Sequence, residues 1–344
     1  MQHPPPEFQL LRLANAFQLS RAVQVAARLR LGRLLESGPK PLEELARLTK
    51  SNERMLLRFL RFLAELGIVT EKEDGFGPTP LSESLHLVDN IAQGEEAWGV
   101  WGALPEALRT GHSPFADVHG AEFYEYAALH PDQGDNWNKW NTVMGLRFFS
   151  AIVPALKLIG HETIVDVGGG EGSGLATILR QAPECRGVLL DLPQSIATAH
   201  KLFAQAGVSE RATLVEGDAL DQVPAGGDVY LVSRVLQNLG DQQASRLLER
   251  CRQSLGRRSR LLIIEKILPE KGSPGRRSLA ASDLNHFLLW GGGHRTRAEM
   301  EALLEHAGLN LLRIENLPAQ AAEWQLLEAL PALPLRMNSD NPDG

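Results

Sequence analysis

The stretch VDVGGGEGSG, residues 165–174, decides the fold of this chain. The apolar residues 164–167 predict a buried parallel strand that ends where the glycines begin, and a helix is expected over 175–180. A second apolar run over 187–190 ends at Asp191, about 20 residues after the last glycine, where a second strand would present a carboxylate to ribose hydroxyls. The pattern predicts an α/β fold with a nucleoside-binding crevice.

The glycine run differs from a dinucleotide fingerprint. Glu171 interrupts it, so no clean GxGxxG remains. Asp166 places a carboxylate beside the loop, and a carboxylate repels phosphate but attracts an ammonium or sulfonium group. Glycine-rich loops also occur as ordinary tight turns, but the ordered acids Asp191 and Asp218 favour a ligand site. We therefore expect a cationic nucleoside as the ligand.

Short segments along nearly the whole chain, in the same order, resemble those of the class I S-adenosylmethionine-dependent methyltransferases. They resemble in particular the small-molecule O-methyltransferases with an N-terminal dimerisation domain, the family of caffeate and acetylserotonin O-methyltransferases. The matching segments are VDVGGGEG (165–172), LLDLP (189–193), EGDAL (216–220), DVYLVSRVLQNLGD (228–241), LLIIEKILP (261–269) and DLNHFLLWGGGHRT (283–296). The resemblance implies a Rossmann-like, doubly wound methyltransferase domain preceded by a mainly helical, winged-helix dimerisation domain.

The resemblance also implies S-adenosylmethionine as the cofactor. Gly168 and its neighbours would lie against the amino-acid part, Asp191 would hold the ribose hydroxyls, and Asp218 would accept from the adenine amino group. The alternative for Asp218 is a turn-forming Gly-Asp pair. The expected cofactor residues are Asp166, Gly168, Gly170, Asp191, Asp218, Ala219, which would pack on the adenine ring, and Ser233, which lies where some members have a cofactor-contacting lysine.

The chain departs from the family at the general base. Members that methylate phenols carry a histidine where this chain has Gln237, and a glutamine amide cannot take up a proton at neutral pH. Glu265 matches one of the two glutamates that orient the family histidine, whereas His294 replaces the other. The usual deprotonation of an acceptor hydroxyl is therefore unavailable from position 237.

His286 and His294 are candidates for a replacement base. His286 falls where the family has a substrate-contacting methionine, so both histidines are expected to face the acceptor. The alternative is that each is a hydrogen-bonded structural histidine, since an imidazole with a pKa of about 6.5 needs no catalytic role. No cluster has metal-ligand spacing, so we expect no catalytic metal.

A tryptophan-rich segment, DNWNKWNTVMGLRFFS over 135–150, is expected to wall the acceptor pocket. Trp140 stands for the phenylalanine of a family Phe-Asn-x-x-Met sequence, and Asn141 and Met144 are kept. An aromatic wall suits a flat acceptor and a sulfonium cation. Packing in a core or interface is the alternative. The expected pocket residues are Trp140, Asn141, Met144, Asn238, Phe287 and Trp290.

Composition supports a two-domain cytoplasmic enzyme. The 344 residues are 43% hydrophobic, enough for two cores, and a net charge of -7 argues against a general nucleic-acid binder. The two cysteines, Cys185 and Cys251, are expected to be reduced thiols. The polar, proline-rich start MQHPPPEF and the lack of a membrane-length apolar run lead us to expect neither a signal sequence nor a membrane span. We expect a small-molecule substrate and a homodimer formed through the N-terminal domain, with neither nucleic acid nor membrane as a partner.

The expected domains are a helical unit over 1–100, linking and lid helices over 101–160, the catalytic domain over 161–335 and a disordered tail over 336–344. Helices are expected over 10–35, 41–48 and 51–66, the last capped by Ser51, and a hairpin over 68–70 and 76–78. Strands are expected over 164–167, 187–191, 213–216, 229–233, 261–267 and 311–315, joined by right-handed crossovers in a parallel sheet.

The winged-helix order suggests a competing function, because winged helices commonly read DNA. The basic residues of its third helix are flanked by apolar ones, as on any solvated amphipathic face, and the family uses this domain to dimerise and to close over the partner's active site. Three hypotheses remain: methyl transfer to a small molecule, a non-methylating reaction of the cofactor, and a winged-helix regulator. The non-methylating reaction could be a hydroxylation, a pericyclic reaction, or cyclisation of the cofactor to an azetidine amino acid with release of methylthioadenosine.

Overall fold

The computed structural model describes residues 5–273 and 275–332, and the chain divides into two compact units. One unit holds the described residues up to 102 together with 129–137. The other holds 103–128 and the described residues from 138 onward. Residues 103–128 and 138–160, expected to form a linking segment, thus belong to the second unit. The expected tail over 336–344 lies outside the described residues.

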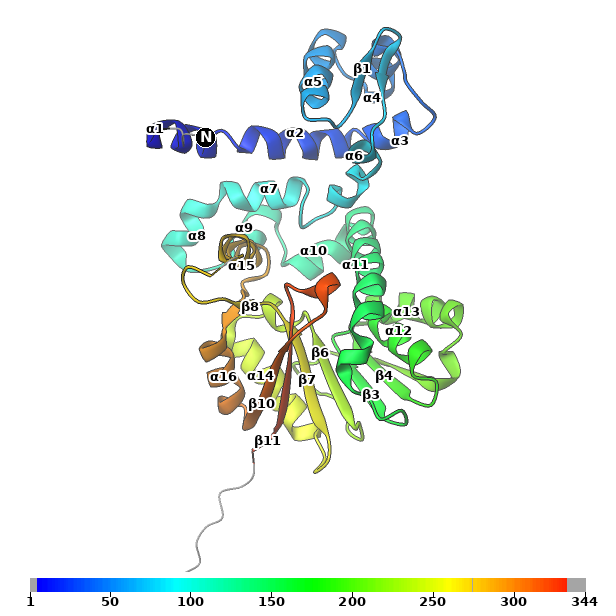
Figure 1. Cartoon of the computed structure of the whole chain (residues 1–344), viewed down its shortest axis with the longest axis vertical. Helices are drawn as coiled ribbons and strands as arrows, with labels where there is room; N and C mark the ends of the chain where they lie inside the picture. Colours follow the sequence, from blue (N-terminus) through cyan, green and yellow to red (C-terminus); the bar gives the residue numbers. More distant parts are fainter. Residues whose placement is uncertain (1–4, 274, 333–344) are drawn as a thin grey trace, which may run out of the picture. The chain divides into compact units, whose positions relative to one another are not determined.

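The first unit is helical (Figure 1). It contains an antiparallel hairpin of β1 and β2 and a core that includes Leu31, Leu45, Leu60 and Phe76. Its elements are α1 (Pro6–Ala14), α2 (Phe17–Arg28), α3 (Leu31–Leu35), α4 (Leu42–Thr49), α5 (Glu53–Glu65), β1 (Thr70–Lys72), β2 (Gly75–Gly77), α6 (Pro80–Glu83) and α7 (Glu95–Gly102). The expected order of helices followed by a hairpin is present.

Two local predictions in this unit are wrong. The helix expected over 10–35 is broken into α1, α2 and α3, and Arg30 before α3 has a positive φ of 55°, which ends a regular helix. The cap of α5 is Asn52, whose side chain accepts from the N–H of Met55, while the hydroxyl of Ser51 bonds to Thr49. Asn and Ser are equally good caps, so composition alone does not choose between neighbours.

The second unit is built on a seven-stranded sheet of order β10-β11-β7-β6-β3-β4-β5. The five strands β7, β6, β3, β4 and β5 run parallel to one another. Strand β11 is antiparallel to both of its neighbours, β7 and β10. The strands are β3 (Thr163–Val167), β4 (Arg186–Asp191), β5 (Ala212–Glu216), β6 (Val229–Ser233), β7 (Arg260–Glu265), β10 (Leu309–Asn316) and β11 (Gln325–Pro331).

Helices cover both faces of this sheet (Figure 1). On one face α12 (Ser173–Gln181), α13 (Pro193–Ala206) and the C-terminal part of α11 (Pro131–Ile152) enclose a core with Ile178 and Phe203. On the other face α14 (Asp241–Ser254) and α16 (Arg297–His306) enclose a second core with Leu247 and Leu304. The expected α/β, doubly wound class with a helical N-terminal unit is confirmed.

The expectation of an all-parallel sheet is wrong at one edge, because β11 was not expected. Glu328 interrupts its apolar residues, and Pro331 ends it. The Glu328 carboxylate is nevertheless buried, and accepts from Nε of Arg313 on β10. A strand with a charged residue at its centre shows neither the alternation nor the apolar run by which strands are recognised.

Four further helices flank the sheet's carboxyl end: α8 (Leu104–Thr110), α9 (Phe115–His119), α10 (Phe123–Leu129) and α15 (Arg276–Trp290). The hydroxyl of Ser113 donates to the carbonyl of Leu288 and ties the start of α9 to α15. A short parallel pair joins β8 (Ile267–Leu268) to β9 (Arg295–Thr296), so the strand expected to continue to Ile267 ends at Glu265.

The strand order reverses between β3 and β6. From β3 the chain proceeds outward to β4 and β5, and then returns to the other side of β3 as β6 and β7. In open α/β sheets ligands bind outside the carboxyl ends of the strands at such a reversal. Asp166, Asp191, Ser233 and Glu265 lie at these ends. The topology therefore places the site at this edge of the sheet.

Candidate active site

The glycine-rich loop packs closely on its surroundings. Gly168 has φ of +69°, donates its N–H to the carbonyl of Leu190, and faces Val235, 3.0 Å from where a Cβ would lie. A Cβ on Gly169 would collide with the carboxylate of Asp166. Glycine is required at both positions, for backbone conformation at the first and for space at the second.

Gly170 and Asp191 join the loop to the neighbouring strand β4. The N–H of Gly170 donates to Oδ2 of Asp191 over 2.7 Å, and the N–H of Leu192 donates to Oδ1 over 2.8 Å. A Cβ on Gly170 would meet nothing within 4 Å, so the loop faces open space there. Burial raises the pKa of Asp191, partly offset by these hydrogen bonds. The side chain of Ser195 also hydrogen-bonds this carboxylate, so three of its four lone-pair sites are used and one remains for a ligand hydroxyl.

Asp166 is buried beneath the loop and accepts from the N–H of Leu175 in the first turn of α12. Burial and the charge of Asp191 raise its pKa to about 7, while Arg234 and the Leu175 hydrogen bond lower it. A carboxylate at a helix N-terminus satisfies an otherwise unpaired donor. Asp166 therefore also fixes the start of α12, a role that the sequence did not indicate.

The remaining expected cofactor residues follow β5 and β6. Asp218 is exposed and its Oδ1 accepts from the N–H of Leu220 over 2.8 Å, so it does form the turn considered as the alternative. Its charge nevertheless raises the pKa of Asp191, so the two carboxylates lie in one electrostatic neighbourhood. Ala219 is half-buried, and the buried Oγ of Ser233 has no hydrogen-bond partner in the described chain.

These features fit a nucleoside cofactor with a cationic amino-acid arm. The open space at Gly170 admits a ligand against the backbone, and the carboxylates of Asp191 and Asp218 offer acceptors to hydroxyl and amino groups. The unpartnered Oγ of Ser233 lies at the strand reversal, between the loop and β7. A buried polar atom without a partner is unfavourable unless a ligand or water completes it.

Gln237 lies in a 3₁₀ turn (Leu236–Asn238) after β6. Its N–H donates to Oε1 of Glu265 over 3.4 Å, and its carbonyl accepts from the N–H of Gly293 over 2.8 Å. The amide Oε1 is buried and has no partner among residues 5–273 and 275–332. The backbone is thus fixed from two sides while the side-chain oxygen remains available as an acceptor.

Glu265, at the end of β7, is buried beside this turn. Burial raises its pKa to about 8, against the opposing effect of N–H groups of Gln237 and Leu236 and the charges of Arg295 and Arg234. Its Oε2 has no hydrogen-bond partner in the part of the chain that the structure describes. At neutral pH a substantial fraction of this carboxyl group is protonated and can donate a hydrogen bond.

The two candidate histidines lie together, with ring centroids 4.6 Å apart. Nδ1 of His286 is 2.8 Å from the carbonyl of Ser282, and Nε2 of His294 is 2.8 Å from the Ser282 hydroxyl. Burial and the nearby Lys266 charge lower the pKa of His286. Burial, His286, Lys266 and Arg295 lower that of His294 to about 3. Both rings are therefore neutral at physiological pH.

The hydrogen bond to Ser282 determines the tautomer of His286. A carbonyl oxygen can only accept, so Nδ1 of His286 carries the proton and donates it to Ser282. In a neutral ring the other nitrogen, Nε2, then has the lone pair. His286 is accordingly in the protonation state that a general base requires.

Arg295 and Tyr124 contact the turn that carries Gln237, and sequence reasoning missed both. Arg295 is buried and donates to the carbonyls of Leu236 and Leu239 and to Asp241. It fixes both ends of the turn that carries Gln237. Both residues lie outside the glycine motif. Arg295 lies within the matched segment 283–296, next to His294, and that position was the signal that the sequence offered.

The expected pocket residues come from α11, α15 and the 3₁₀ turn. Nδ2 of Asn238 donates to the hydroxyl of Tyr124 over 3.0 Å. The Trp290 ring packs between Phe123 and His286, with centroid distances of 4.6 and 5.0 Å. Phe287 on α15 and Trp140, Asn141 and Met144 on α11 are half-buried.

The part of α11 that bears Trp140 and Met144 is anchored to the glycine-rich loop. The hydroxyl of Thr142 donates to Oε2 of Glu171 over 2.7 Å. Gly145 lies so close to the hydroxyl of Ser173 that a Cβ would not fit. The structure thus brings α11 to the loop, and Trp290 and Asn238 to the histidines and Gln237.

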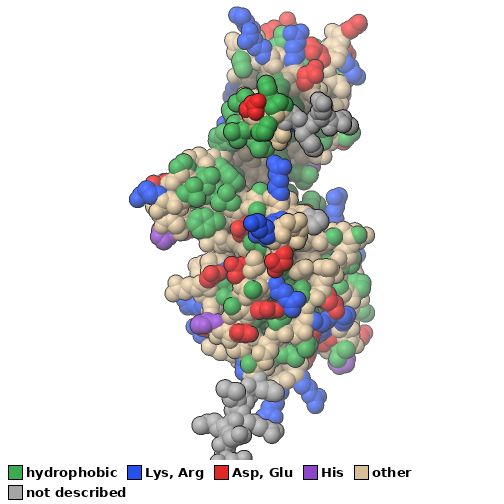
Figure 2. Space-filling model, turned by 60° about the vertical axis from the view of Figure 1, so that its left-hand side comes forward, with side chains coloured by type: hydrophobic (Ala, Val, Ile, Leu, Met, Phe, Trp, Pro, Cys, Tyr) green, Lys and Arg blue, Asp and Glu red, His purple; other side chains and the backbone are tan. Residues whose placement is uncertain are grey.

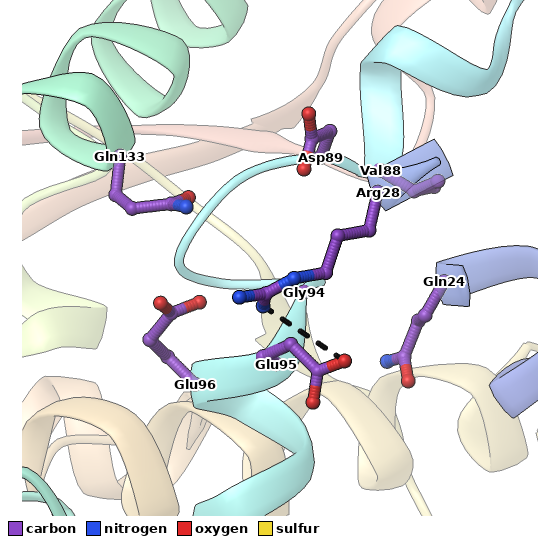
Figure 3. Close-up of a pocket in the computed structure, with 8 residues that line it drawn as sticks. All are labelled: Gln24, Arg28, Val88, Asp89, Gly94, Glu95, Glu96 and Gln133. Carbon is purple, nitrogen blue, oxygen red and sulfur yellow. Dashed lines mark ion pairs between the residues drawn. The ribbon is translucent and has the colours of Figure 1, made fainter. Parts of the chain in front are cut away.

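A separate small pocket lies within the helical unit and contains none of these residues (Figure 3). Arg28 and Glu95 form an ion pair of 3.9 Å across it, and burial raises the pKa of Asp89 there. Among the residues that the structure describes, no group of His, Cys, Asp or Glu side chains is arranged to hold a metal ion.

Comparison with known proteins identifies both units. Residues 101–310 match the family model of the O-methyltransferase domain, and residues 11–87 match that of the O-methyltransferase dimerisation domain. The chain is 34% identical over 330 residues to the phenazine O-methyltransferase PhzM of Lysobacter antibioticus, covering 94% of this chain and 95% of that protein. It is 31% identical over 302 residues to the aclacinomycin 10-hydroxylase RdmB of Streptomyces purpurascens, covering 84% and 81%.

A solved structure of the O-methyltransferase NcsB1 from neocarzinostatin biosynthesis, in complex with S-adenosylmethionine and 2-hydroxy-5-methyl naphthoic acid, is also similar. The TM-score is 0.81 at 26% sequence identity, over 91% of this chain and 96% of that one. The family match, the fold and the residues around the glycine-rich loop agree on the cofactor. The chain therefore belongs to the O-methyltransferase family, and it is a methyltransferase whose cofactor is S-adenosylmethionine.

Proposed function

We propose that this protein transfers the methyl group of S-adenosylmethionine to a flat small-molecule acceptor without a histidine base at position 237. The observation that carries the proposal is the protonation chemistry of two side chains, Gln237 and His286. Gln237 occupies the place of the family base but cannot take a proton, while His286 is neutral with its lone pair on Nε2.

The roles follow from the contacts. The bound cofactor supplies an electrophilic methyl group on sulfur. Asp191 and the loop at Gly170 orient its ribose, and Asp218 with Ala219 binds the adenine. The acceptor oxygen forms a bond to the methyl carbon as the carbon–sulfur bond breaks, and S-adenosylhomocysteine is released. Proximity and alignment supply most of the rate enhancement of such a displacement.

Proton removal depends on the acceptor. If the acceptor carries a hydroxyl group, its proton passes to Nε2 of His286 and then to water. If the acceptor is already anionic, no proton leaves and no base is needed. Gln237 Oε1 and the partly protonated Glu265 are positioned to hydrogen-bond the acceptor and orient it. His294, with its pKa near 3, remains neutral and is proposed as a hydrogen-bonding partner.

The acceptor is proposed to be an aromatic compound of secondary metabolism. Trp140, Met144, Phe287 and Trp290 supply an apolar and aromatic wall. The named ligands and substrates of the similar proteins are themselves flat: a phenazine and a hydroxynaphthoic acid.

A second candidate keeps the cofactor but transfers no methyl group. The observation that favours it is the glutamine at position 237, together with the similarity to a protein named as a hydroxylase. Its forms are hydroxylation, a pericyclic reaction, or cyclisation of the aminobutyryl arm with loss of methylthioadenosine.

The assembly is proposed to be a homodimer formed through the helical unit. Large apolar side chains of α1 and α2 are exposed, and Figure 2 shows hydrophobic side chains gathered on this unit. The residues are Phe8, Leu10, Leu11, Leu13, Phe17 and Leu19. Exposed patches of this kind mark interaction sites, and the order of helices and hairpin fits a winged-helix dimerisation domain.

The location is proposed to be the cytoplasm, because both Cys185 and Cys251 are free and buried. As a separate finding, each helix in the described ranges is too short or too polar to cross a bilayer.

Mass spectrometry tests the proposed reaction. The purified protein is incubated with methyl-labelled S-adenosylmethionine, first alone and then with 3-hydroxy-2-naphthoate or 1-hydroxyphenazine. Label in the aromatic product supports methyl transfer. Methylthioadenosine formed without acceptor, above a heat-inactivated control, supports the second candidate and contradicts the first.

A further inference from the structure

Ser282 contacts both candidate histidines. It is half-buried on α15, one helical turn before His286. Its carbonyl oxygen is 2.8 Å from Nδ1 of His286, and its hydroxyl group is 2.8 Å from Nε2 of His294. The next residue, Asp283, accepts the backbone N–H of His294 over 2.6 Å. Two consecutive residues of one helix therefore hold His294 by its ring and by its backbone.

The bond between the Ser282 hydroxyl group and His294 can form in two directions, because a hydroxyl group both donates and accepts. If Ser282 donates to Nε2, the neutral ring of His294 has its hydrogen on Nδ1. If Ser282 accepts from Nε2, the lone pair is on Nδ1 instead. The distance of 2.8 Å fits both directions, so the direction depends on the other partners of these atoms.

The other partners favour Ser282 as the donor. Within residues 5–273 and 275–332 its hydroxyl group has no second hydrogen-bond partner, and Nδ1 of His294 is buried without one. If Ser282 donates, only the Nδ1–H group of His294 stays unsatisfied. If Ser282 accepts, both its own O–H group and the lone pair on Nδ1 stay unsatisfied. Polar groups without a partner inside a protein cost free energy, so the first arrangement is the more stable.

Both histidines then carry their hydrogen on Nδ1 but offer different atoms to a ligand. His286 donates from Nδ1 to the Ser282 carbonyl, which leaves the lone pair on Nε2. His294 accepts at Nε2, which leaves its Nδ1–H group as a donor. The two ring centroids are 4.6 Å apart, and the Trp290 ring packs on His286 with a centroid distance of 5.0 Å. A hydrogen-bond acceptor and a donor thus lie side by side next to an aromatic ring.

We propose that Ser282 is a positioning residue that sets the tautomers of both histidines, and that the resulting pair selects an acceptor molecule with a hydroxyl group beside a carbonyl oxygen or a ring nitrogen. The hydroxyl group donates to Nε2 of His286, and the neighbouring oxygen or nitrogen atom accepts from Nδ1–H of His294, which has no partner in the described chain. The tautomers do not depend on the proposed function, whereas the choice of acceptor rests on it.

Nuclear magnetic resonance of isotope-labelled histidine nitrogens tests the tautomers, because a ring nitrogen that bears a hydrogen resonates far from one with a lone pair. We expect the hydrogen on Nδ1 of both rings in wild type. Ser282→Ala removes the hydroxyl group and keeps the carbonyl, so His294 should lose its single tautomer while His286 keeps its own. Ser282→Thr should restore the signal of His294. Ser278→Ala, at an exposed position one turn earlier on α15, is the control.

Calorimetry on protein saturated with S-adenosylhomocysteine tests the acceptor. The two ligands are 8-hydroxyquinoline, with a ring nitrogen beside its hydroxyl group, and 1-naphthol, with a C–H group in the same place. Wild type is expected to bind the quinoline about 5- to 10-fold more tightly, which corresponds to one further hydrogen bond. Ser282→Ala should abolish this preference without weakening 1-naphthol, and Ser282→Thr should restore it.

A hydrogen on Nε2 of His294 in wild type, or an equal preference in wild type and Ser282→Ala, would overturn the proposal. If neither ligand binds wild type, the inference about the acceptor is wrong, and the resonance experiment alone decides on Ser282. If the quinoline is preferred but receives no methyl group from S-adenosylmethionine, the role of Ser282 is supported while the proposed function is contradicted.

Discussion

The carboxylate of Asp191 accepts the N–H of Gly170, so the residue expected to hold the ribose also holds the glycine-rich loop. Asparagine has one acceptor oxygen where aspartate has two, so Asp191→Asn must give up Gly170 or Leu192. We expect the dissociation constant of S-adenosylhomocysteine to rise about 10- to 100-fold by calorimetry. Asp228→Asn is the matched control, because Asp228 accepts the N–H of Thr163 at the opposite end of the sheet. Equal affinities of wild type and Asp191→Asn would contradict the assignment.

Replacing His286 by glutamine should slow only reactions that release a proton. For a phenolic acceptor we expect kcat to fall about 100-fold or more, while an acceptor that is already anionic should be unaffected. Because the pKa of His286 is lowered, the wild-type rate should be level above about pH 6.5 and decline only below it. Initial rates measured over a series of pH values with both acceptors test this. His200→Gln, at an exposed position, is the control. Identical pH profiles for wild type and His286→Gln would exclude this base.

Histidine at position 237 should restore the base that the family uses. The turn is fixed by backbone bonds to Glu265 and Gly293, so Gln237→His should place an imidazole beside the Glu265 carboxyl without moving the backbone. We expect methylation of a simple phenol to rise at least tenfold. Gln222→His, an exposed replacement of the same kind, is the control. If the rate does not change, the acceptor does not reach position 237.

Glu265 should make the protein less stable as the pH rises. Its folded pKa of about 8 lies above the unfolded value of 4.5, so the folded state binds more protons between these values and stability falls across that window. Each unit of difference between the folded and unfolded pKa corresponds to about 1.4 kcal/mol of stability. Glu265→Gln should flatten the dependence of urea midpoints on pH between 5 and 8, within the window set by those two pKa values.

Glu162 is the matched control with the opposite sign. Although burial opposes it, hydrogen bonds from Ile159 and Gly160 lower its pKa, so its contribution is present above the unfolded pKa and is lost on acidification. Glu162→Gln should therefore lower stability at neutral pH and leave the decline between pH 5 and 8 in place. A wild-type stability that rises over this range would contradict the role given to Glu265.

Replacing Arg295 is expected to lower the stability of the fold, because this residue holds the turn that carries Gln237. Arg295→Gln removes donors to the carbonyls of Leu236 and Leu239, and the expected loss in the free energy of unfolding is about 2–4 kcal/mol. Urea unfolding checks this, with the exposed Arg297→Gln as control. A loss below about 0.5 kcal/mol would show that the turn does not depend on Arg295.

The central sheet was predictable because its strands are short apolar runs, several of which end at a glycine or an acid. The approximate positions of β3 to β7 and β10 followed from these patterns. β11 did not, since its buried Glu328 is stabilised by Arg313, a partner fifteen positions earlier that only the folded hairpin brings near. Periodicity reports burial of apolar faces and not of paired charges.

The candidate site was predictable where a residue lies in a motif and not where its role depends on a partner. Gln237, His286 and Glu265 stood out because they occupy known positions. The tautomer of His286 depends on the carbonyl of Ser282, one helical turn away. Only the folded surroundings leave the buried Oε1 of Gln237 without a partner among the described residues. A sequence names side chains but not the atoms that face them.

The arrangement around Arg295 has an evolutionary consequence. Arg295 binds the carbonyls of Leu236 and Leu239, and Glu265 accepts from the N–H of Gln237. All of these are main-chain atoms, so neither contact depends on which side chain stands at position 237. Mutation at this position can therefore alter reactivity without refolding its surroundings. A scaffold of this kind permits new chemistry to arise by a single substitution, and descendants with different reactions can share one architecture.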